Sequence, residues 1–215
     1  MRAASNITLS AGRAAAAFRK DQSGGVLIEF ALVVAVFLFL FAALLDFGRL
    51  SYSGVTAQNA SQLAARIAAV RPPACAGLPL TNQRGPSTLN LRFGTSCSAA
   101  AGVCSSVPTI SCTGDAANPT AAEIWGRVNP LLPIGSTIDM LQFTYSYDSN
   151  IGFLGGPYSP MLTVELALDD FQFVSPLAAL ANAAGATNSS LGTAANYSSF
   201  SVSLPAEDLA TGESR

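Results

Sequence analysis

The chain has 215 residues, of which 50% are apolar and 11% are charged, and it contains no histidine, which excludes histidine-based triads, metal sites and acid–base chemistry. The net charge of −2 is unevenly spread, because residues 1–20 hold four basic residues and no acid, whereas from Gly25 onward seven arginines face twelve acidic residues. This mildly acidic part lacks the clustered basic surface that nucleic-acid binding demands.

A continuous apolar run from Gly25 to Leu45 predicts a membrane-spanning helix. About 21 residues at 1.5 Å each cover roughly 30 Å, the thickness of the hydrocarbon core of a bilayer. Basic residues precede the run and Asp46 follows it, so the positive-inside rule predicts a cytoplasmic N-terminus and an extracytoplasmic remainder. A cleaved secretory signal is the alternative, but its apolar core is shorter, and the best cleavage site, residues 55–57, lies too far downstream.

One carboxylate, Glu29, lies just inside the start of this run. A charge at the middle of a membrane costs about 2.5–3.5 kcal/mol, and less near an interface, so its presence needs a physical reason. Snorkelling toward the cytoplasmic face relieves part of this cost. The alternative is pairing with a free α-amino group of another chain, which requires a new N-terminus at Gly25. The preceding Gly24 has no side chain and suits a peptidase that grips the backbone closely.

The helix is expected to continue to Val70, where Pro72-Pro73 ends it. If it is unbroken across both halves, it is about 45 residues and about 68 Å long. Asp46 and Arg49 are three residues apart and can either pair at the outer membrane interface or be solvated separately. The expected apolar face of the second half follows i, i+3, i+4 spacing and comprises Ala60, Leu63, Ala64, Ile67 and Val70.

Residues 74–119 are rich in alanine, glycine, serine, threonine and proline and are expected to form a loop. They contain all four cysteines of the chain, Cys75, Cys97, Cys104 and Cys112. Because this region is placed outside the cytoplasm, two disulfides are the natural interpretation, and the sequence does not choose among the three pairings. A four-thiolate zinc site is the alternative, although no C-x-x-C spacing is present.

A short helix and a strand are expected next. Residues 120–128 predict the helix, with Thr120 and Glu123 as a capping box and an apolar face around Trp125. Residues 138–147 predict the strand, with its aromatic side chains on one face. Trp125 and the aromatic stripe are expected to pack in a core, with ligand or sugar binding as the alternative.

The C-terminal part predicts two more strands. Residues 161–174 alternate as a strand with an irregularity at Asp169-Asp170. These acids lack the spacing of a calcium loop and are expected to be turn or edge charges. Residues 177–184 are expected to be helix-like, and a low-complexity loop follows them. Residues 197–204 predict the last strand, before an acidic tail.

The expected fold class is α+β, with a small antiparallel sheet lying on the outer half of a long N-terminal helix and with a disulfide-stapled loop. This order resembles that of type IV pilin-like proteins. The expected organisation is a cytoplasmic leader at 1–24, a transmembrane helix at 25–45, an extracytoplasmic helix extension at 46–71 and an extracytoplasmic globular domain at 72–215.

The helix and its flanks carry a more specific resemblance. Gly24, a gap of four residues and then Glu29-Phe30 resemble a type IV prepilin peptidase site. The whole pattern comprises residues 23–33, 46–52 and 58–66 and resembles the TadE-like family, pseudopilins of the Tad (tight adherence, Flp pilus) system. Asp46 stands where this family usually has Glu, a change that keeps the charge.

The resemblance implies that a dedicated prepilin peptidase cuts after Gly24, at a site formed by Gly24, Gly25, Glu29 and Phe30. It implies a minor pseudopilin that helps to assemble thin adhesive pili, since the major pilins of this system are very short. The implied partners are the peptidase, other pilin-like subunits and the Tad inner-membrane assembly proteins. The implied location is the bacterial inner membrane, with a single span and a periplasmic domain. Incorporation of the protein into the pilus is an open alternative.

In such an assembly, Glu29 of one subunit is expected to neutralise the Gly25 amine of a neighbour. An enzyme is not expected, because histidine, a G-x-S-x-G elbow and an S-x-x-K motif are all absent. No catalytic, metal or cofactor-binding residue is assigned, and no cofactor is expected. The alternative function is a single-pass, membrane-anchored extracytoplasmic binding module that does not join a pilus and lacks processing at Gly24.

Overall fold

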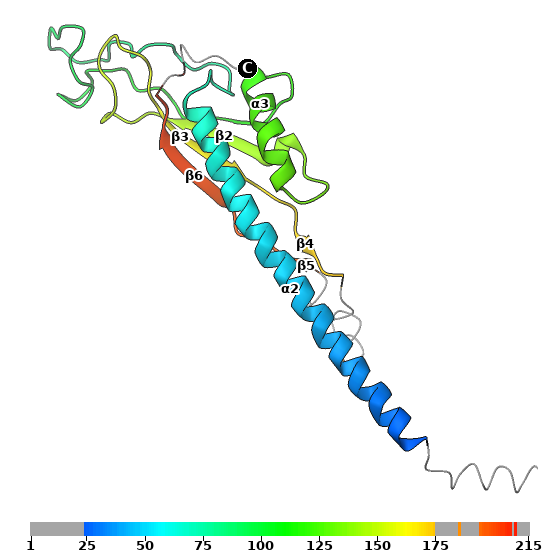
Figure 1. The fold of residues 1–215 in the computed structure, drawn as a ribbon. Coiled ribbons are helices and arrows are strands. Elements are labelled where there is room, and N and C mark those ends of the chain that lie inside the picture. Colours follow the sequence, from blue (N-terminus) through cyan, green and yellow to red (C-terminus); the bar gives the residue numbers. More distant parts are fainter. Residues whose placement is uncertain (1–23, 175–184, 186–193, 208, 210–215) are drawn as a thin grey trace, which may run out of the picture.

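The computed structural model describes residues 24–174, 185, 194–207 and 209, and its fold is α+β, as predicted (Figure 1). The expected leader and the expected helix-like stretch at 177–184 lie outside the described residues. The elements in chain order are α2 (Gly25–Ala69), β1 (Ile110–Thr113), α3 (Pro119–Val128), η1 (Asn129–Leu131), η2 (Ile138–Met140), β2 (Leu141–Ser146), β3 (Met161–Leu166), β4 (Phe171–Gln172), β5 (Ala194–Ala195) and β6 (Phe200–Pro205).

Helix α2 runs unbroken for 45 residues, which confirms the predicted long helix, and is about 68 Å long. It contains no proline, and Gly48 and Gly54 lie within it without interrupting it. Its first half projects away from the rest of the described molecule, whereas its second half lies against the main sheet and α3 (Figure 1). A single element therefore connects the apolar segment to the folded domain.

The second half of α2 buries a face of small side chains, called the alanine face below. Its members are spaced three and four apart and are Ala57, Ala60, Ser61, Ala64, Ala65, Ala68 and Ala69. The predicted face was only partly correct, because Leu63 and Val70 are 36% and 44% exposed. The sheet and α3 contact the side of α2 that carries alanine, since small side chains let neighbouring elements approach the helix closely.

Four strands form the main sheet in the order β1-β2-β3-β6, and each neighbouring pair is antiparallel. Along β2 and β3, buried side chains alternate with more exposed ones, as expected for a sheet with one face against helices. Phe143 of β2 lies opposite Val164 of β3, which lies opposite Val202 of β6. Their buried face shares one core with the alanine face and with Ile124 of α3.

Strand β1 was not predicted, because residues 74–119 were expected to form a loop throughout. The strand has only four residues, two of them serine and threonine, so its local pattern is weak. Cys112 of β1 lies opposite Phe143 of β2 and is covalently bonded to Cys75. Pairing and the covalent bond hold this strand at the edge of the sheet, and neither is visible in a local pattern.

The single strand predicted for residues 161–174 is two strands in different sheets. Strand β3 ends at Leu166 and β4 covers only Phe171–Gln172, so the predicted irregularity at Asp169-Asp170 is a complete break. Strand β4 pairs with β5, which lies in a stretch that was expected to be a loop. The break lets the chain leave the main sheet and run beside α2 toward its apolar half (Figure 1).

The other two predicted strands begin later than expected. Strand β2 begins at Leu141, because residues 138–140 form the short helix η2. Strand β6 begins at Phe200 and not at Tyr197, whose ring instead contacts the rings of Phe171 and Phe200. Phe143 and Tyr145 of the aromatic stripe and Trp125 of α3 pack in or against the main core, as expected, whereas Tyr147 lies beyond β2 and packs against a separate small core that includes Val103.

Helix α3 begins one residue earlier than predicted, and its cap is Asn118 and not Thr120. The Asn118 side-chain oxygen accepts the Ala121 N–H at 3.0 Å, and Pro119 takes the first helical position. Thr120 is buried at 1% exposure and is part of the helix itself. An asparagine before a proline is a stronger start signal than the capping box that was inferred.

Glu123 of α3 is bonded to Arg71, just beyond the end of α2. The Arg71 Nε and Nη2 atoms donate to the two carboxylate oxygens of Glu123 at 3.0 and 3.3 Å. The hydrogen bond to Glu123 raises the pKa of Arg71 above its usual value. This pair joins elements 52 residues apart, and it replaces the capping role that the sequence suggested for Glu123.

Both predicted disulfides form, and the structure pairs Cys75 with Cys112 and Cys97 with Cys104. The first joins residues 37 apart and the second joins residues 7 apart. The second lies in a separate small core that includes Val103. Loop-closure entropy alone predicts that the longer loop contributes about 4 kcal/mol and the shorter one about 2.5 kcal/mol.

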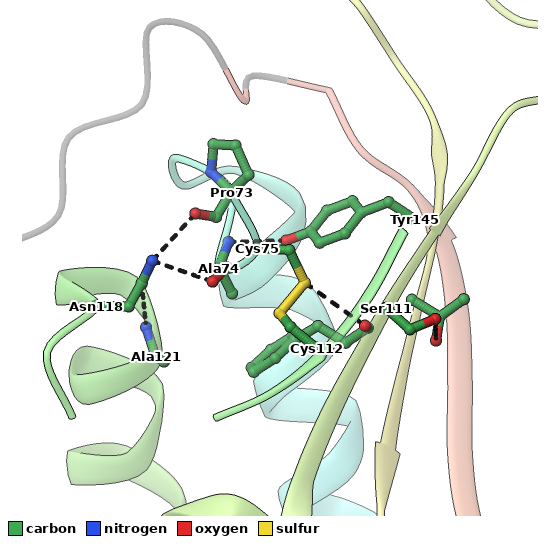
Figure 2. The surroundings of a disulfide bond; sticks show 10 residues. Pro73, Ala74, Cys75, Ser111, Cys112, Asn118, Ala121 and Tyr145 are labelled. Atoms are coloured by element: carbon green, nitrogen blue, oxygen red, sulfur yellow. Dashed lines mark hydrogen bonds between the residues drawn. A yellow bond between two sulfur atoms is a disulfide. The ribbon is translucent and has the colours of Figure 1, made fainter. Parts of the chain in front are cut away.

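The segment between α2 and Cys75 is fixed by hydrogen bonds to Pro73 and Ala74 (Figure 2). The Ala74 N–H donates to the Tyr145 hydroxyl at 3.1 Å, and burial raises the pKa of that hydroxyl. The Asn118 side-chain amide donates to the carbonyl oxygens of Pro73 and Ala74 at 3.3 and 3.1 Å. The chain that leaves α2 is thereby connected to β1, β2 and α3 within three residues.

Loss of the Cys75–Cys112 disulfide is expected to destabilise the domain more than loss of the other one. The variant Cys75→Ser/Cys112→Ser should lose about 1.5 kcal/mol more unfolding free energy than Cys97→Ser/Cys104→Ser, because it releases the longer loop. Urea unfolding of the full chain in detergent, followed by the fluorescence of Trp125, the only tryptophan, measures both. A larger loss for the shorter loop would contradict this ordering.

Removal of the Arg71 side chain is expected to lower the urea midpoint, because it leaves the carboxylate of Glu123, whose side chain is 7% exposed, without a bidentate partner. Arg71→Lys should restore only part of the loss, since a lysine cannot donate two parallel hydrogen bonds. Arg127→Ala is the matched control, because Arg127 is an exposed arginine on α3. An unchanged midpoint for Arg71→Ala would show that the pair does not stabilise the domain.

Candidate processing site and its link to the domain

The predicted processing residues lie together at the start of α2. Gly24 immediately precedes the helix, and its carbonyl oxygen accepts the Ile28 N–H at 3.2 Å. A side chain added at Gly24 or at Gly25 would meet no other heavy atom within 4 Å. Within the described residues, the fold thus gives no reason for glycine at either position. Both residues are exposed there, so another protein can reach them.

Glu29 and Phe30 follow one turn later, and both side chains are exposed. Among the described residues, none is within hydrogen-bonding or ion-pair distance of the Glu29 carboxylate. Glu29 lies four residues after Gly25, so the two share one face of the helix. The carboxylate is therefore available to a cation, either at the start of its own helix or on another chain.

The segment from Gly25 to Leu45 is apolar on all sides. Its most apolar window of 18 residues has a mean hydropathy of 2.9, and none of that window is buried inside the described structure. Consecutive exposed side chains such as Val36, Phe37 and Leu38 lie about 100° apart around the axis, so apolar side chains face every direction, and Glu29 is the one charged residue of the segment. Among the described residues, α2 is the one helix long and apolar enough to cross a membrane.

Asp46 ends the apolar segment and connects it to the domain. Its side chain is only 4% exposed, and one carboxylate oxygen accepts the backbone N–H of Val174 at 3.1 Å. The other oxygen accepts from Arg49 at 3.4 Å, so of the two alternatives that the sequence left open, pairing and separate solvation, the structure shows pairing. Arg49 also lies over the ring of Phe171, 5.5 Å from its centre. Sequence reasoning found the charge pair but missed its contact with the chain around β4.

A groove of about 590 Å³ lies between α2, the loop that follows α3 and the break before β4. Asp169 and Asp170 line it, and both are exposed, as expected for turn charges. Within the described residues, no group of three or more cysteine, aspartate or glutamate residues is arranged to hold a metal ion. In the described part of the domain Asp169 and Asp170 are exposed, whereas the side chain of Glu123 is only 7% exposed and is bonded to Arg71.

Comparison with known proteins gives one match. The model of the TadE-like protein family matches residues 24–66, whereas no curated protein and no solved structure matches the chain. The matched segment begins at Gly24, contains Glu29 and Asp46, and extends into the alanine face. The glycine pair, the apolar helix and the first part of its buried extension together form the segment that is similar to the TadE-like family.

Proposed function

We propose that this protein is a minor pseudopilin-type structural component of a Tad pilus system, which a prepilin peptidase cuts after Gly24. The observation that carries the proposal is the TadE-like match over residues 24–66, together with the open glycine pair one turn before an exposed acid. The alternative is an anchored extracytoplasmic binding module that keeps its leader and joins no filament.

The proposed location is the bacterial inner membrane, with the leader in the cytoplasm and the domain in the periplasm. Four basic residues before the apolar segment support this orientation by the positive-inside rule. The two disulfides support it independently, because disulfides persist in oxidising compartments such as the periplasm and are rare in the cytosol. Both arguments support the same side of the membrane for the domain.

Cleavage after Gly24 would free the amine of Gly25 at the first residue of α2. The amine would carry a positive charge at the edge of a low-dielectric region, where an opposite charge stabilises it. Glu29 of a neighbouring subunit would supply that charge in the assembled state. Loss of one partner from such a buried pair costs about 3–5 kcal/mol, because it leaves an uncompensated charge.

The Glu29 of the same chain is a competing partner, because it lies four residues after Gly25, on the same face of the helix. Before assembly, this internal pair would reduce the cost of placing Glu29 in the membrane. On assembly, the amine would exchange its own Glu29 for that of a neighbour. Such an exchange conserves the number of ion pairs and makes the axial position of each subunit depend on one charge.

The rigid connection between the two halves of α2 supports a structural role. An unbroken helix transmits the position of its first turn to the domain, which contacts it along the alanine face. We further propose that the protein acts without catalysis, and that its partners are the peptidase, other pilin-like subunits and Tad inner-membrane assembly proteins. The domain would select among these partners through its exposed surface.

The first test is the intact mass of the protein purified from membranes of cells that contain the matching peptidase. We expect a chain that begins at Gly25, and a Gly24→Val variant that keeps its leader, since a side chain at this position blocks a close grip on the backbone. That variant should still fold, because nothing within 4 Å opposes a Cβ there. An uncut native chain would favour the anchored binding module.

The second test replaces Glu29 by glutamine or by leucine. Both variants are expected to insert in the membrane and to be cut, yet to reduce the yield of surface pili severely, because the neighbour's amine loses its partner. Asp170→Asn is the matched control, since it removes an exposed acid from the domain. Normal pilus yield with both Glu29 variants would contradict the pairing mechanism.

A further inference from the structure

Four aromatic rings, one of them on α2, form a chain of contacts beside the helix directly after its apolar half, and this group is called the aromatic collar below. Phe47 of α2 contacts Phe173, with ring centres 5.8 Å apart. Phe173 contacts Phe171 at 5.3 Å, and Phe171 contacts Tyr197 at 6.4 Å. The rings come from three segments that are far apart in sequence, so the fold gathers them at one level of the helix.

Polar contacts hold the collar to the helix at fixed points. The Asp46 carboxylate accepts the Val174 N–H at 3.1 Å, and the hydroxyl groups of Ser53 and Tyr197 lie 2.7 Å apart. Arg49, between these two points, stacks over Phe171. Figure 1 shows β4 and β5 beside α2, between the main sheet and the projecting half of the helix. The collar is therefore a built part of the domain and has a defined height along α2.

The outer side of this level is apolar and exposed. Val174 is 77% exposed and Phe47 is 55% exposed. Leu44 and Leu45, which directly precede Asp46, are 72% and 54% exposed, so the apolar surface continues from the projecting helix onto this level. No other described part of the chain covers these side chains.

We propose that the aromatic collar is a membrane-docking surface, seated in the headgroup layer of the same bilayer that holds α2. This inference rests on the membrane insertion in the proposed function. The apolar segment has about 21 residues and spans about 31 Å, so a bilayer core of about 30 Å ends near Asp46. Residues 46–53, and the rings held against them, then lie within the interfacial layer, where aromatic side chains are enriched.

The charges at this level fit the same position. Asp46 at the edge of the hydrocarbon core would be costly if it stood alone, yet it is shielded by the Val174 N–H and by Arg49. The Arg49 side chain is 57% exposed, so its guanidinium can reach lipid phosphates while it remains beside Asp46. The domain thus supplies the groups that make a carboxylate acceptable at this depth.

The test places one tryptophan at each of three sites in a Trp125→Phe background, in the full-length chain reconstituted into phosphatidylcholine vesicles with bromine near the headgroup end of the acyl chains. Val174→Trp reports on the collar and Leu38→Trp reports on the apolar half. Leu80→Trp, on an exposed loop of the domain, is the matched control for the affinity of tryptophan itself, since Leu80 is 66% exposed. Tryptophan is chosen because a new cysteine could exchange with the disulfides.

We expect bromine to quench Val174→Trp and Leu38→Trp strongly and to leave Leu80→Trp near its value in unbrominated vesicles. An interfacial side chain buried about 5–10 Å deep should lose a large fraction of its emission, at least about half as much as the tryptophan at position 38 loses. If Leu38→Trp is quenched and Val174→Trp is not, the collar proposal fails and the membrane span stands. If Leu38→Trp is not quenched, the span and the collar proposal fail together.

Discussion

The close contact between the alanine face of α2 and the main sheet is the interaction on which the rest of the structure depends. Small side chains on the helix let the sheet supply the large ones, such as Phe143, Leu162 and Val164, so a single core forms between them. The same helix is apolar on every side in its first half. One continuous helix thus carries both a segment apolar enough to cross a membrane and one side of the core of the domain. The domain cannot move along or around the helix without opening this core.

Directional contacts at the two ends of this interface fix the height and the rotation of the domain. Asp46 bonds to Val174 near the apolar half, and Arg71 bonds to Glu123 beyond the other end. Asp46 and Arg71 are 25 positions apart in the sequence, which corresponds to about 38 Å at the rise of an α-helix. Apolar contact alone is non-directional, so the hydrogen bonds select one arrangement among those that bury similar area.

The long helix could be predicted because its signals are local and repeated: an apolar run without proline, a helical spacing of alanines, and Pro72-Pro73 at the end. Its buried face could not be predicted correctly, because large apolar residues such as Leu63 dominate a hydrophobicity pattern while close contact with the sheet selects alanine. The presence of two disulfides also followed from the sequence, whereas their pairing depends on β1, whose four residues gave no strand signal of their own.

The candidate site likewise has a part that could be predicted from the sequence and a part that could not. The glycine pair and Glu29 are visible in sequence because their spacing is fixed within one helical turn. The contact of Asp46 with Val174 joins a side chain to a backbone N–H 128 residues away, and a backbone donor leaves no mark in the sequence. Glu123 was assigned to a local cap, because its actual partner, Arg71, is 52 residues distant. Long-range pairs of this kind need the three-dimensional fold.

The Cys75–Cys112 bond gives the domain a particular response to mechanical tension. Strand β6 and strand β1 form opposite edges of the main sheet, and β6 lies against α2. The bond attaches β1 to Cys75, which lies just beyond the C-terminal end of α2. A force that pulls along α2 is therefore shared between a broad non-covalent contact at one edge and a covalent tether at the other, so the sheet is not peeled open from a single side.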